Sequence, residues 1–373
     1  MTTLSLAMIV RNNADTLQDI IPEAIACGVT EIVIVDTAPD KSDDGTYDIA
    51  WRDTYGLDNI KFLHFPWIDD FAAARNFAFE NTHGSHILWL DSDDRIPERS
   101  QETIAELVRS GDLDGQNALF MQYAMFDSKG NVSSTFIRER IISREAFDTT
   151  SKWVGRVHEC IAIYDPAVRI NEVIEHKPLP SKTPDPGRNL RILDSMYEDG
   201  DRSPRTLFYY ARELYWNGNF AKAILMYERW ITTSPIDWEL YSGRLELADC
   251  YAKMENKEKQ KSVLLDAIMS IPSRAEAWVD LGKIFYDKKE WAESVPFFRA
   301  ACGAKRPESG FVNEHTYGTL PYDYLATSLS WSGSIEEAYQ ITKDVLLPVN
   351  PVDERILGNI SFYERQLNSE SYG

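Results

Sequence analysis

The stretch HILWLDSDD, residues 86–94, decides the fold of the first half of the chain. It runs from a nearly continuous apolar segment, His86 to Leu90, directly into the acidic cluster Asp91-Ser92-Asp93-Asp94. An apolar run of this length is typical of a strand that is buried on both faces, as in a parallel sheet covered by helices. Ligands of such sheets bind beyond the carboxyl ends of the strands. We therefore expect the acidic cluster at the ligand-binding edge of a sheet.

Three similar apolar segments precede this one, at Leu4–Val10, Glu31–Asp36 and Lys61–Phe65. The segments between them have helical character, and one of them is the alanine-rich run Phe71–Asn81. Alternation of strands and helices predicts an α/β domain with a Rossmann-like, mostly parallel sheet. The polar residues that close these strands are expected to converge on one edge. They are Arg11, Asn12, Asp36 and the cluster Asp91 to Asp94.

The second half of the chain has the pattern of helical repeats. After the proline-rich stretch 177–188, four helix–turn–helix copies follow one another. The positions after their turns are spaced by 37, 34 and 44 residues, and the last interval carries an insertion around 307–321. They are Phe220, Lys257, Trp291 and Ile335. A period near 34 residues is typical of tetratricopeptide-like repeats, which are stable only when stacked into a solenoid. The sequence thus predicts an α/β domain over residues 1–180 and a helical repeat domain over 188–373.

Composition excludes several classes of protein. The 373 residues include 39 basic and 59 acidic side chains, for a net charge of −20. Such a surface repels nucleic-acid backbones and anionic membranes. The four cysteines are far apart and form no CxxC pair, so we expect reduced thiols. No apolar run approaches ~18 residues, and the start has no basic segment before its apolar run, which predicts a cytoplasmic protein without a transmembrane segment.

The strongest chemical signal is the pair Asp91 and Asp93 at the end of the apolar strand. Two carboxylates one residue apart can face the same ligand if the backbone turns there. Carboxylate oxygens in an open loop suit Mg²⁺ or Mn²⁺ together with diphosphate oxygens. The alternative is that the carboxylates are merely solvated, as acidic loops commonly are.

A second signal is Arg75 in FPWIDDFAAARNFAFE, residues 65–80. It lies in an alanine-rich and aromatic helix, close to the expected core. A buried arginine needs an anionic partner, which here is either the acidic cluster or a phosphate. Asp69, just before the helix, is expected to cap it.

A third signal is His158-Glu159, which lies between short strand-like segments. Glu159 is either a solvated residue or a general base. His158 and His176 are each either structural histidines or ligands of the site, and the sequence does not decide which of the two would bind a metal.

Seven motifs in a fixed order resemble the family 2 glycosyltransferases of the GT-A fold, in particular bacterial members with C-terminal tetratricopeptide-like helices. The motifs are AMIVRNN, EIVIVDT, DDGT, HFPWIDDFAAARNFAFE, ILWLDSDD, WVGRVHE and IEHKP. Each motif alone is only weakly specific for the family, whereas the order of all seven along residues 3–180 is specific. The resemblance implies a GT-A fold for the N-terminal domain.

The resemblance also implies roles for individual residues. It places the base and ribose of a nucleotide at Val10, Asn12 and Asp36, and the diphosphate near Arg75. Asp91 and Asp93 match the DxD motif, and His176 matches a C-terminal metal ligand, which implies a metal site of Asp91, Asp93 and His176. Glu159 matches the acidic base of inverting enzymes. The full set of implied donor-binding residues is Val10, Arg11, Asn12, Asp36, Arg75, Asp91 and Ser92.

Two departures from the family pattern are visible. Arg11 stands where a lysine is usual, with Asn13 in place of the following acidic residue. The motif IEHKP lacks the tyrosine-glycine that often follows the histidine corresponding to His176.

The function implied by the resemblance is a metal-dependent, inverting glycosyltransferase that uses Mn²⁺ or Mg²⁺. Its donor would be a nucleotide-sugar, a UDP-sugar favoured over a GDP-sugar. The acceptor would offer a hydroxyl or another nucleophile, and a protein or peptide is one candidate. The helical half would bind that acceptor or form a homodimer.

Two other functions remain open at this point. A nucleotidyltransferase on a similar sheet would need a glycine-rich loop with a lysine near the first strand, which RNNADT lacks. A non-catalytic repeat scaffold with a degenerate nucleotide-binding domain is the other alternative. The intact set of Asp91, Asp93, Arg75 and Glu159 argues against such decay.

Overall fold

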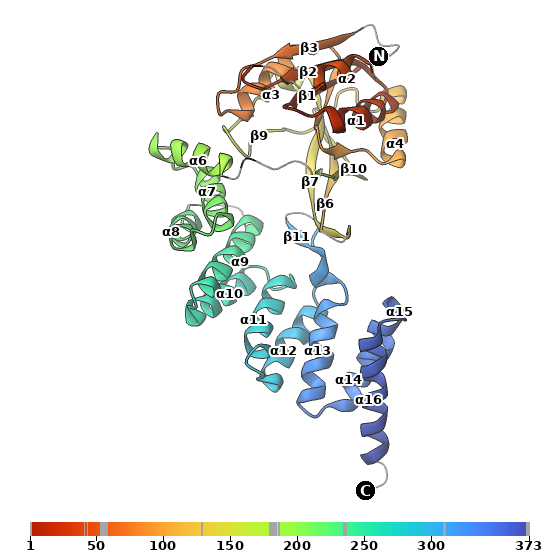
Figure 1. Cartoon of the computed structure of the whole chain (residues 1–373), viewed down its shortest axis with the longest axis vertical. Coiled ribbons are helices and arrows are strands. Elements are labelled where there is room, and N and C mark those ends of the chain that lie inside the picture. The colour runs from red at the N-terminus through yellow and green to blue at the C-terminus, as the bar shows by residue number, and fades with distance from the viewer. Residues whose placement is uncertain are drawn as a thin grey trace. The chain divides into compact units, whose positions relative to one another are not determined.

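A mixed β-sheet forms the centre of the first half of the chain (Figure 1). Its hydrogen-bonded order is β3-β2-β1-β4-β7-β6-β10-β5. These strands are β1 (Leu4–Val10), β2 (Val29–Asp36), β3 (Ile60–His64), β4 (His86–Asp91), β5 (Asp94–Arg95), β6 (Ala118–Phe126), β7 (Val132–Ser143) and β10 (Ala167–His176). Strands β3, β2, β1 and β4 pair in parallel, which confirms the parallel sheet that the alternating segments predict. Strand β7 is antiparallel to both β4 and β6, and β10 runs parallel to β6 and antiparallel to β5.

In this computed structural model the described residues are 2–40, 42, 44–52, 59–127, 130–178, 185, 187–233, 237–308 and 311–370. The segment from Leu119 to Ile141 predicts a hairpin around residues 128–131, and β6 and β7 form it. Its turn residues 128–129 lie outside the described residues. Most of the proline-rich stretch lies outside them too. The sequence also predicts a helix toward Tyr55 after the polar loop that follows Asp36, and its residues after Arg52 lie outside the described residues.

Helices cover both faces of the parallel part of the sheet. On β1, Leu6 and Met8 pack with helix α1 in one core cluster, whereas Ala7 packs with helix α3 in the other. Because both faces of the strand are buried, its sequence is apolar throughout rather than alternating. The helices of this half are α1 (Ala14–Ala26), α2 (Thr46–Arg52), α3 (Phe71–Glu80), α4 (Glu98–Ser110), α5 (Arg144–Thr149) and α6 (Arg188–Glu198).

The second half consists mainly of helices. Its helices are α7 (Pro204–Trp216), α8 (Phe220–Ile231), α9 (Asp237–Lys253), α10 (Lys257–Ser270), α11 (Glu276–Tyr286), α12 (Trp291–Cys302), α13 (Leu320–Trp331), α14 (Ile335–Ile341), α15 (Leu347–Val349) and α16 (Glu354–Glu370). The insertion carries β11 (Val312–Asn313) and the 3₁₀ turn η1 (Glu314–Tyr317), and η2 (Thr342–Leu346) is a π-helical segment.

The predicted repeats are confirmed by where these helices begin. Each of the four positions taken from the sequence spacing is the first residue of the second helix of a pair: α8, α10, α12 and α14. Small residues lie where the helices touch. A Cβ added to Gly282 of α11 would come within 2.8 Å of the Phe298 ring on α12. The half is therefore a tetratricopeptide-like solenoid.

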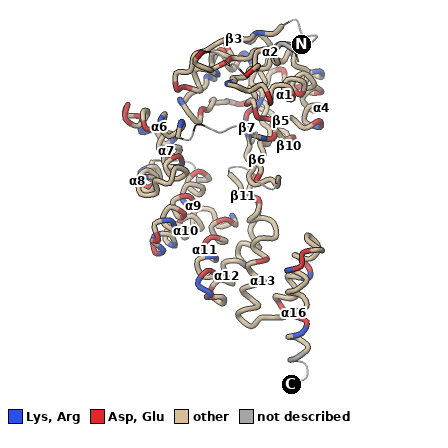
Figure 2. The backbone as a smooth tube through the Cα atoms, viewed as in Figure 1, with Lys and Arg blue, Asp and Glu red and all other residues tan. Residues whose placement is uncertain are grey.

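The chain divides into two compact units, Met1–Arg202 and Ser203–Gly373. This division places helix α6 with the first unit, whereas the sequence pattern groups every residue from 188 onward with the repeats. Acidic residues are spread along both units rather than gathered in one (Figure 2). Among the described residues, no helix combines the length and the apolar character needed to cross a bilayer.

Candidate active site at the carboxyl edge of the sheet

Strand register brings predicted site residues to one edge of the sheet. Val10, the last residue of β1, is the register partner of Asp36 on β2, and Ile9 is the partner of Asp91 on β4. These three strands are parallel, so their carboxyl ends meet there. The expectation that polar strand ends converge is therefore confirmed for Asp36 and Asp91.

The acidic cluster forms a tight turn between β4 and β5. The backbone N–H of Asp91 donates to Oδ2 of Asp94 at 2.9 Å, which closes the turn and leaves Ser92 and Asp93 at its tip. Asn13 ties the tip to the end of β1, because its Nδ2 donates to Ser92 Oγ at 2.5 Å while its Oδ1 accepts from the N–H of Arg11. The turn lets neighbouring acidic side chains leave the sheet in different directions.

Arg75 of helix α3 lies beside this turn and is buried. Its Nη2 donates to Asp91 Oδ1 at 2.6 Å, and its Nε donates to Glu159 Oε1 at 2.5 Å. The guanidinium carbon lies 4.7 Å from the centre of the Trp89 ring and 5.3 Å from that of Trp153. A single buried cation thus holds two carboxylates from distant parts of the chain between aromatic side chains.

The charges at this edge shift the ionisation of its members. Burial opposes charge on Arg75, but the Asp91 and Glu159 carboxylates outweigh it and raise the pKa of the guanidinium. Burial likewise opposes ionisation of Asp91, yet Arg75 and then Arg140 hold the pKa of that carboxyl at about 2. Asp93 differs from Asp91, because burial raises the pKa of the Asp93 carboxyl and outweighs the opposing effect of His176. Two carboxylates one residue apart therefore have different affinities for protons.

Glu159 reaches the site from a small hairpin, β8 (Trp153–Val154) with β9 (Cys160–Ile161). The hairpin is fixed to the start of α3, because the N–H of Phe71 donates to the carbonyl of Arg156 at 2.8 Å. Its loop contains Gly155 at φ +94° and His158 at φ +52°. The side chain of Glu159 is 10% exposed.

The start of α3 differs from expectation. Asp70, not Asp69, caps this helix by accepting from the N–H of Ala73 at 2.9 Å. Asp69 has a left-handed backbone at φ +57° and accepts from Trp67 Nε1 at 2.7 Å. That backbone turns the Asp69 carboxylate away from the first helical N–H groups.

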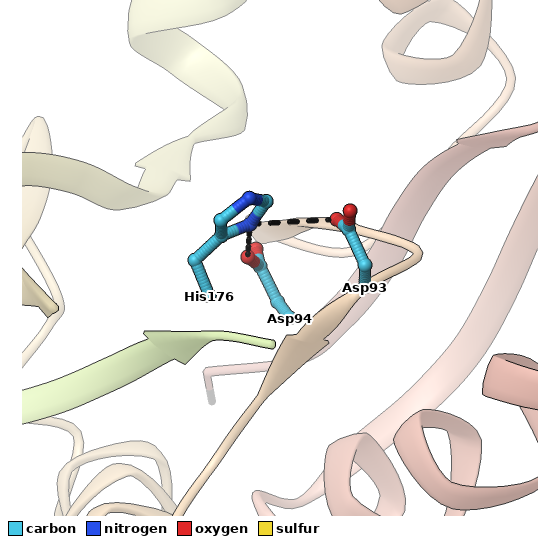
Figure 3. A group of neighbouring side chains, drawn as sticks. All are labelled: Asp93, Asp94 and His176. Atoms are coloured by element: carbon cyan, nitrogen blue, oxygen red, sulfur yellow. Dashed lines mark ion pairs between the residues drawn. The ribbon is translucent and has the colours of Figure 1, made fainter. Parts of the chain in front are cut away.

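His176 arrives from the last residue of β10, which pairs with β5 so that His176 lies opposite Asp94. Its Nδ1 is 3.6 Å from Oδ1 of Asp93 and 3.9 Å from Oδ1 of Asp94 (Figure 3). Burial lowers the pKa of His176, but the Asp94 and Asp93 carboxylates outweigh it and raise that pKa. Among the described residues, these three form the group whose ligand atoms lie close enough together to hold a metal ion.

The family model for glycosyl transferase family 2 matches residues 5–168. These residues form a family 2 glycosyltransferase domain. The matched segment contains Arg75, Asp91, Asp93 and Glu159, whereas His176 lies beyond its end.

Two proteins and one solved structure indicate the range of the similarity. The SPbeta prophage-derived glycosyltransferase SunS of Bacillus subtilis is 22% identical over 224 residues, 57% of this chain and 49% of its own. A TPR repeat-containing protein of Synechococcus elongatus is 38% identical over 99 residues, 26% of this chain and 22% of its own. The chain thus spans about half the length of the first relative and about a fifth of the second. The structure of S. aureus TarS with UDP-GlcNAc aligns with 70% of this chain and 90% of its own at 13% identity and a TM-score of 0.43.

Some predicted residues of the glycosyltransferase domain have partners within their own loops. The carboxylate of Asp36 accepts from the N–H of Ala38 at 2.9 Å and from the N–H of Ser42 at 2.6 Å. Asn12 has a left-handed backbone at φ +51°, and its N–H donates to Ser42 Oγ at 2.9 Å. Arg11 is exposed. These residues shape the loop after β2 at the predicted nucleotide-binding edge.

The metal-site expectation and the geometry differ in one member. Asp93 and His176 lie together as expected, but Asp91 is bound to Arg75, and Asp94 takes its place in the group. His158 is not a member of this group. Asp94 is not among the site residues expected from the sequence, although it belongs to the same acidic cluster. Asp94 is the first residue of β5 and is fully buried, which its place in the acidic cluster does not by itself indicate.

Proposed function

We propose that this chain is a metal-dependent, inverting glycosyltransferase that moves a sugar from a nucleotide-sugar to a hydroxyl or another nucleophile of an acceptor. The observation that carries the proposal is the double contact of Arg75 with Asp91 and Glu159 inside a family 2 glycosyltransferase domain. It brings the residue matching the first DxD carboxylate and the residue matching the catalytic base to one buried cation.

Asp93 and His176 are the residues we assign to a divalent ion, Mn²⁺ or Mg²⁺. Asp93 offers a carboxylate oxygen and His176 an imidazole nitrogen, and both are donors that suit Mn²⁺, so the residues fit the ion. When bound, the ion would neutralise charge on the donor diphosphate and make it a better leaving group. Asp91, held by Arg75, would face the donor ribose.

Glu159 is the residue we assign as the base. Arg75 binds its Oε1, so Oε2 is the oxygen that would accept the proton of the acceptor nucleophile. The acceptor oxygen then forms a bond to the anomeric carbon as the bond from that carbon to the diphosphate oxygen breaks. The attack comes from the face opposite the leaving group, so this single displacement inverts the configuration.

The donor we favour is a UDP-sugar, and the acceptor we favour is a protein or peptide. The second preference is supported by the helical unit, because repeat solenoids present extended surfaces that commonly bind polypeptides. The net charge of −20 argues against a nucleic-acid acceptor.

The test is calorimetric titration of UDP and of GDP, each with and without Mn²⁺. The proteins are the full chain, Asp93→Ala and a matched control, Asp148→Ala, which removes an exposed carboxylate of the same unit. We expect one nucleotide to bind only with Mn²⁺, and this binding to be lost in Asp93→Ala and kept in the control. Absence of binding by both nucleotides under all conditions would contradict the proposal and favour a repeat scaffold.

A further inference from the structure

Three buried side chains behind the acidic turn form one hydrogen-bonded chain that ends on His176. Arg140 Nη1 donates to Asp94 Oδ2 at 2.9 Å, and the Tyr123 hydroxyl donates to Asp94 Oδ1 at 2.6 Å. The same hydroxyl oxygen lies 3.0 Å from Nδ1 of His176. Arg140 and Asp94 are 0% exposed and Tyr123 is 6% exposed, so water does not compete for these contacts.

The protons available to Arg140, Asp94 and Tyr123 determine the direction of the hydrogen bond between Tyr123 and His176. Asp94 is paired with Arg140, so its carboxylate only accepts. The Tyr123 hydroxyl carries a single proton, as tyrosine does below its usual pKa of about 10. That proton is donated to Asp94, so the phenol oxygen can only accept from His176. Nδ1 must therefore carry a hydrogen.

The other atoms near Nδ1 lead to the same result. The Asp93 and Asp94 oxygens at 3.6 and 3.9 Å are also acceptors only, but both are beyond hydrogen-bond distance. Figure 3 shows Nδ1 facing both carboxylates. Tyr123 is thus the partner of Nδ1 within hydrogen-bond distance.

We propose that Tyr123, held by Asp94 and Arg140, is a positioning residue that keeps neutral His176 in the Nδ1–H tautomer and so makes Nε2 the nitrogen offered to a ligand. A histidine that binds a metal almost always donates its other N–H to a fixed partner, which sets both the tautomer and the ring orientation. The tautomer itself does not depend on the proposed function; only the identity of the ligand at Nε2 does.

The same geometry uses both carboxylate oxygens of Asp94. Its Oδ1 accepts from Tyr123, and its Oδ2 accepts from Arg140 and from the N–H of Asp91. Asp94 therefore serves as a buried anchor that joins the turn bearing Asp93 to the phenol that orients His176. This bracing is enough to explain why Asp94 lies close to Asp93 and His176.

Ring packing determines where the Tyr123 hydroxyl lies. The Arg140 guanidinium carbon is 4.3 Å from the centre of the Tyr123 ring and 4.3 Å from that of Trp89. On another side, Phe136 meets Tyr123 edge to face with ring centres 5.2 Å apart. Tyr123→Phe should keep these ring contacts and remove only the hydroxyl, whereas Phe136→Leu removes packing and keeps the hydroxyl.

The experiment uses the metal-free full chain with ¹⁵N-labelled histidine. Long-range proton–nitrogen NMR spectra, recorded at alkaline pH where the imidazole is neutral, report which ring nitrogen bears the hydrogen. His176→Gln identifies the His176 signals among the six histidines. We expect a protonated Nδ1 and an unprotonated Nε2 in the wild type and in Phe136→Leu, and a rise of the Nε2–H tautomer in Tyr123→Phe.

A wild-type His176 in the Nε2–H tautomer would overturn the proposal, even if no variant folds. Full retention of Nδ1–H in Tyr123→Phe would overturn the role given to Tyr123. As a second readout, Mn²⁺ titration should show affinity about 10- to 100-fold lower in Tyr123→Phe and unchanged in Phe136→Leu. If neither nucleotide binds the protein but the tautomer is as stated, the proposed function fails and this inference stands.

Discussion

Glu31 lies near the amino end of strand β2, and Asp91 lies at the carboxyl end of strand β4 in the same parallel part of the sheet. The carboxyl group of each has a pKa of about 2. Burial opposes ionisation of both. Glu31 overcomes it with local donors, because its Oε2 accepts from the Ser5 hydroxyl and from the N–H of His83, each at 2.6 Å. Lys61 adds a charge at 3.4 Å. Asp91 overcomes it with arginines, chiefly Arg75 at 2.6 Å.

The two carboxylates differ in how much of each side chain is exposed and could contact a ligand. The side chain of Glu31 is 4% exposed, whereas that of Asp91 is 36% exposed. Asp91 also has neighbours whose pKa is raised, Asp93 and His176, while Glu31 is surrounded by donors that satisfy it. A lowered pKa by itself thus marks a well-bonded carboxylate; a candidate site needs open acceptor atoms and titrating neighbours as well.

The largest expected effect is a loss of activity, which we expect for a substitution beside Asp91 and not for one at Glu31. Glu159→Gln should lower the rate constant of sugar transfer by about 10²- to 10⁴-fold, because the amide cannot accept the proton of the nucleophile. Nucleotide affinity should be nearly unchanged. The measurement is a steady-state transfer assay combined with calorimetry, with Glu31→Gln as the matched control that keeps the rate. Loss of nucleotide binding together with transfer would show that the assignment of the base is wrong.

The next largest effect is a loss of stability, which we expect when Glu31 is replaced. Because the folded-state pKa of Glu31 is lowered from 4.5 to about 2, its ionisation stabilises the fold above pH 4.5. That stabilisation is lost as the pH falls through 2. Glu31→Gln should therefore lower the free energy of unfolding by about 3 kcal/mol at neutral pH and by much less near pH 2. Urea denaturation across this pH range measures it; a difference independent of pH would contradict the role of the charge.

A smaller effect tests whether one guanidinium must hold two carboxylates. Arg75→Lys keeps the charge but cannot donate to both Asp91 and Glu159 in the same geometry. Loss of one charge-assisted hydrogen bond should lower kcat/KM about 10- to 100-fold. Arg95→Lys, which changes an arginine paired with Asp19 in the same unit, is the control. Equal losses in both variants would mean that the double contact of Arg75 has no special role.

The smallest effect concerns Lys61, the partner that makes the longest contact with Glu31. The Lys61 side chain is 30% exposed, and its contact with Glu31 is the longest of that cluster. Lys61→Met should lower the free energy of unfolding by at most about 1 kcal/mol and leave transfer unchanged. Chemical denaturation and the transfer assay measure both quantities. A loss as large as that of Glu31→Gln would show that the lysine, rather than the hydrogen bonds, stabilises Glu31.

The elements of this protein were largely predictable from its sequence. Strands Leu4–Val10 and His86–Asp91 have the bounds that their apolar runs predict, and the second helices of the repeats begin at the predicted residues. Burial of Arg75 followed from its alanine-rich helix. These features depend on periodicity and on local composition, and both are properties of neighbouring residues.

The pairing of side chains within the site was decided by the tertiary structure. Glu159 meets Arg75 across 84 residues of sequence, and Tyr123 meets His176 across 53. Asp91 faces Arg75 rather than the group of Asp93 and His176, because the turn closed by Asp94 directs adjacent carboxylates apart. The sequence by itself determined which residues reach the carboxyl edge of the sheet. Strand register and buried packing determined which atoms they leave open, because those depend on contacts that no local pattern encodes.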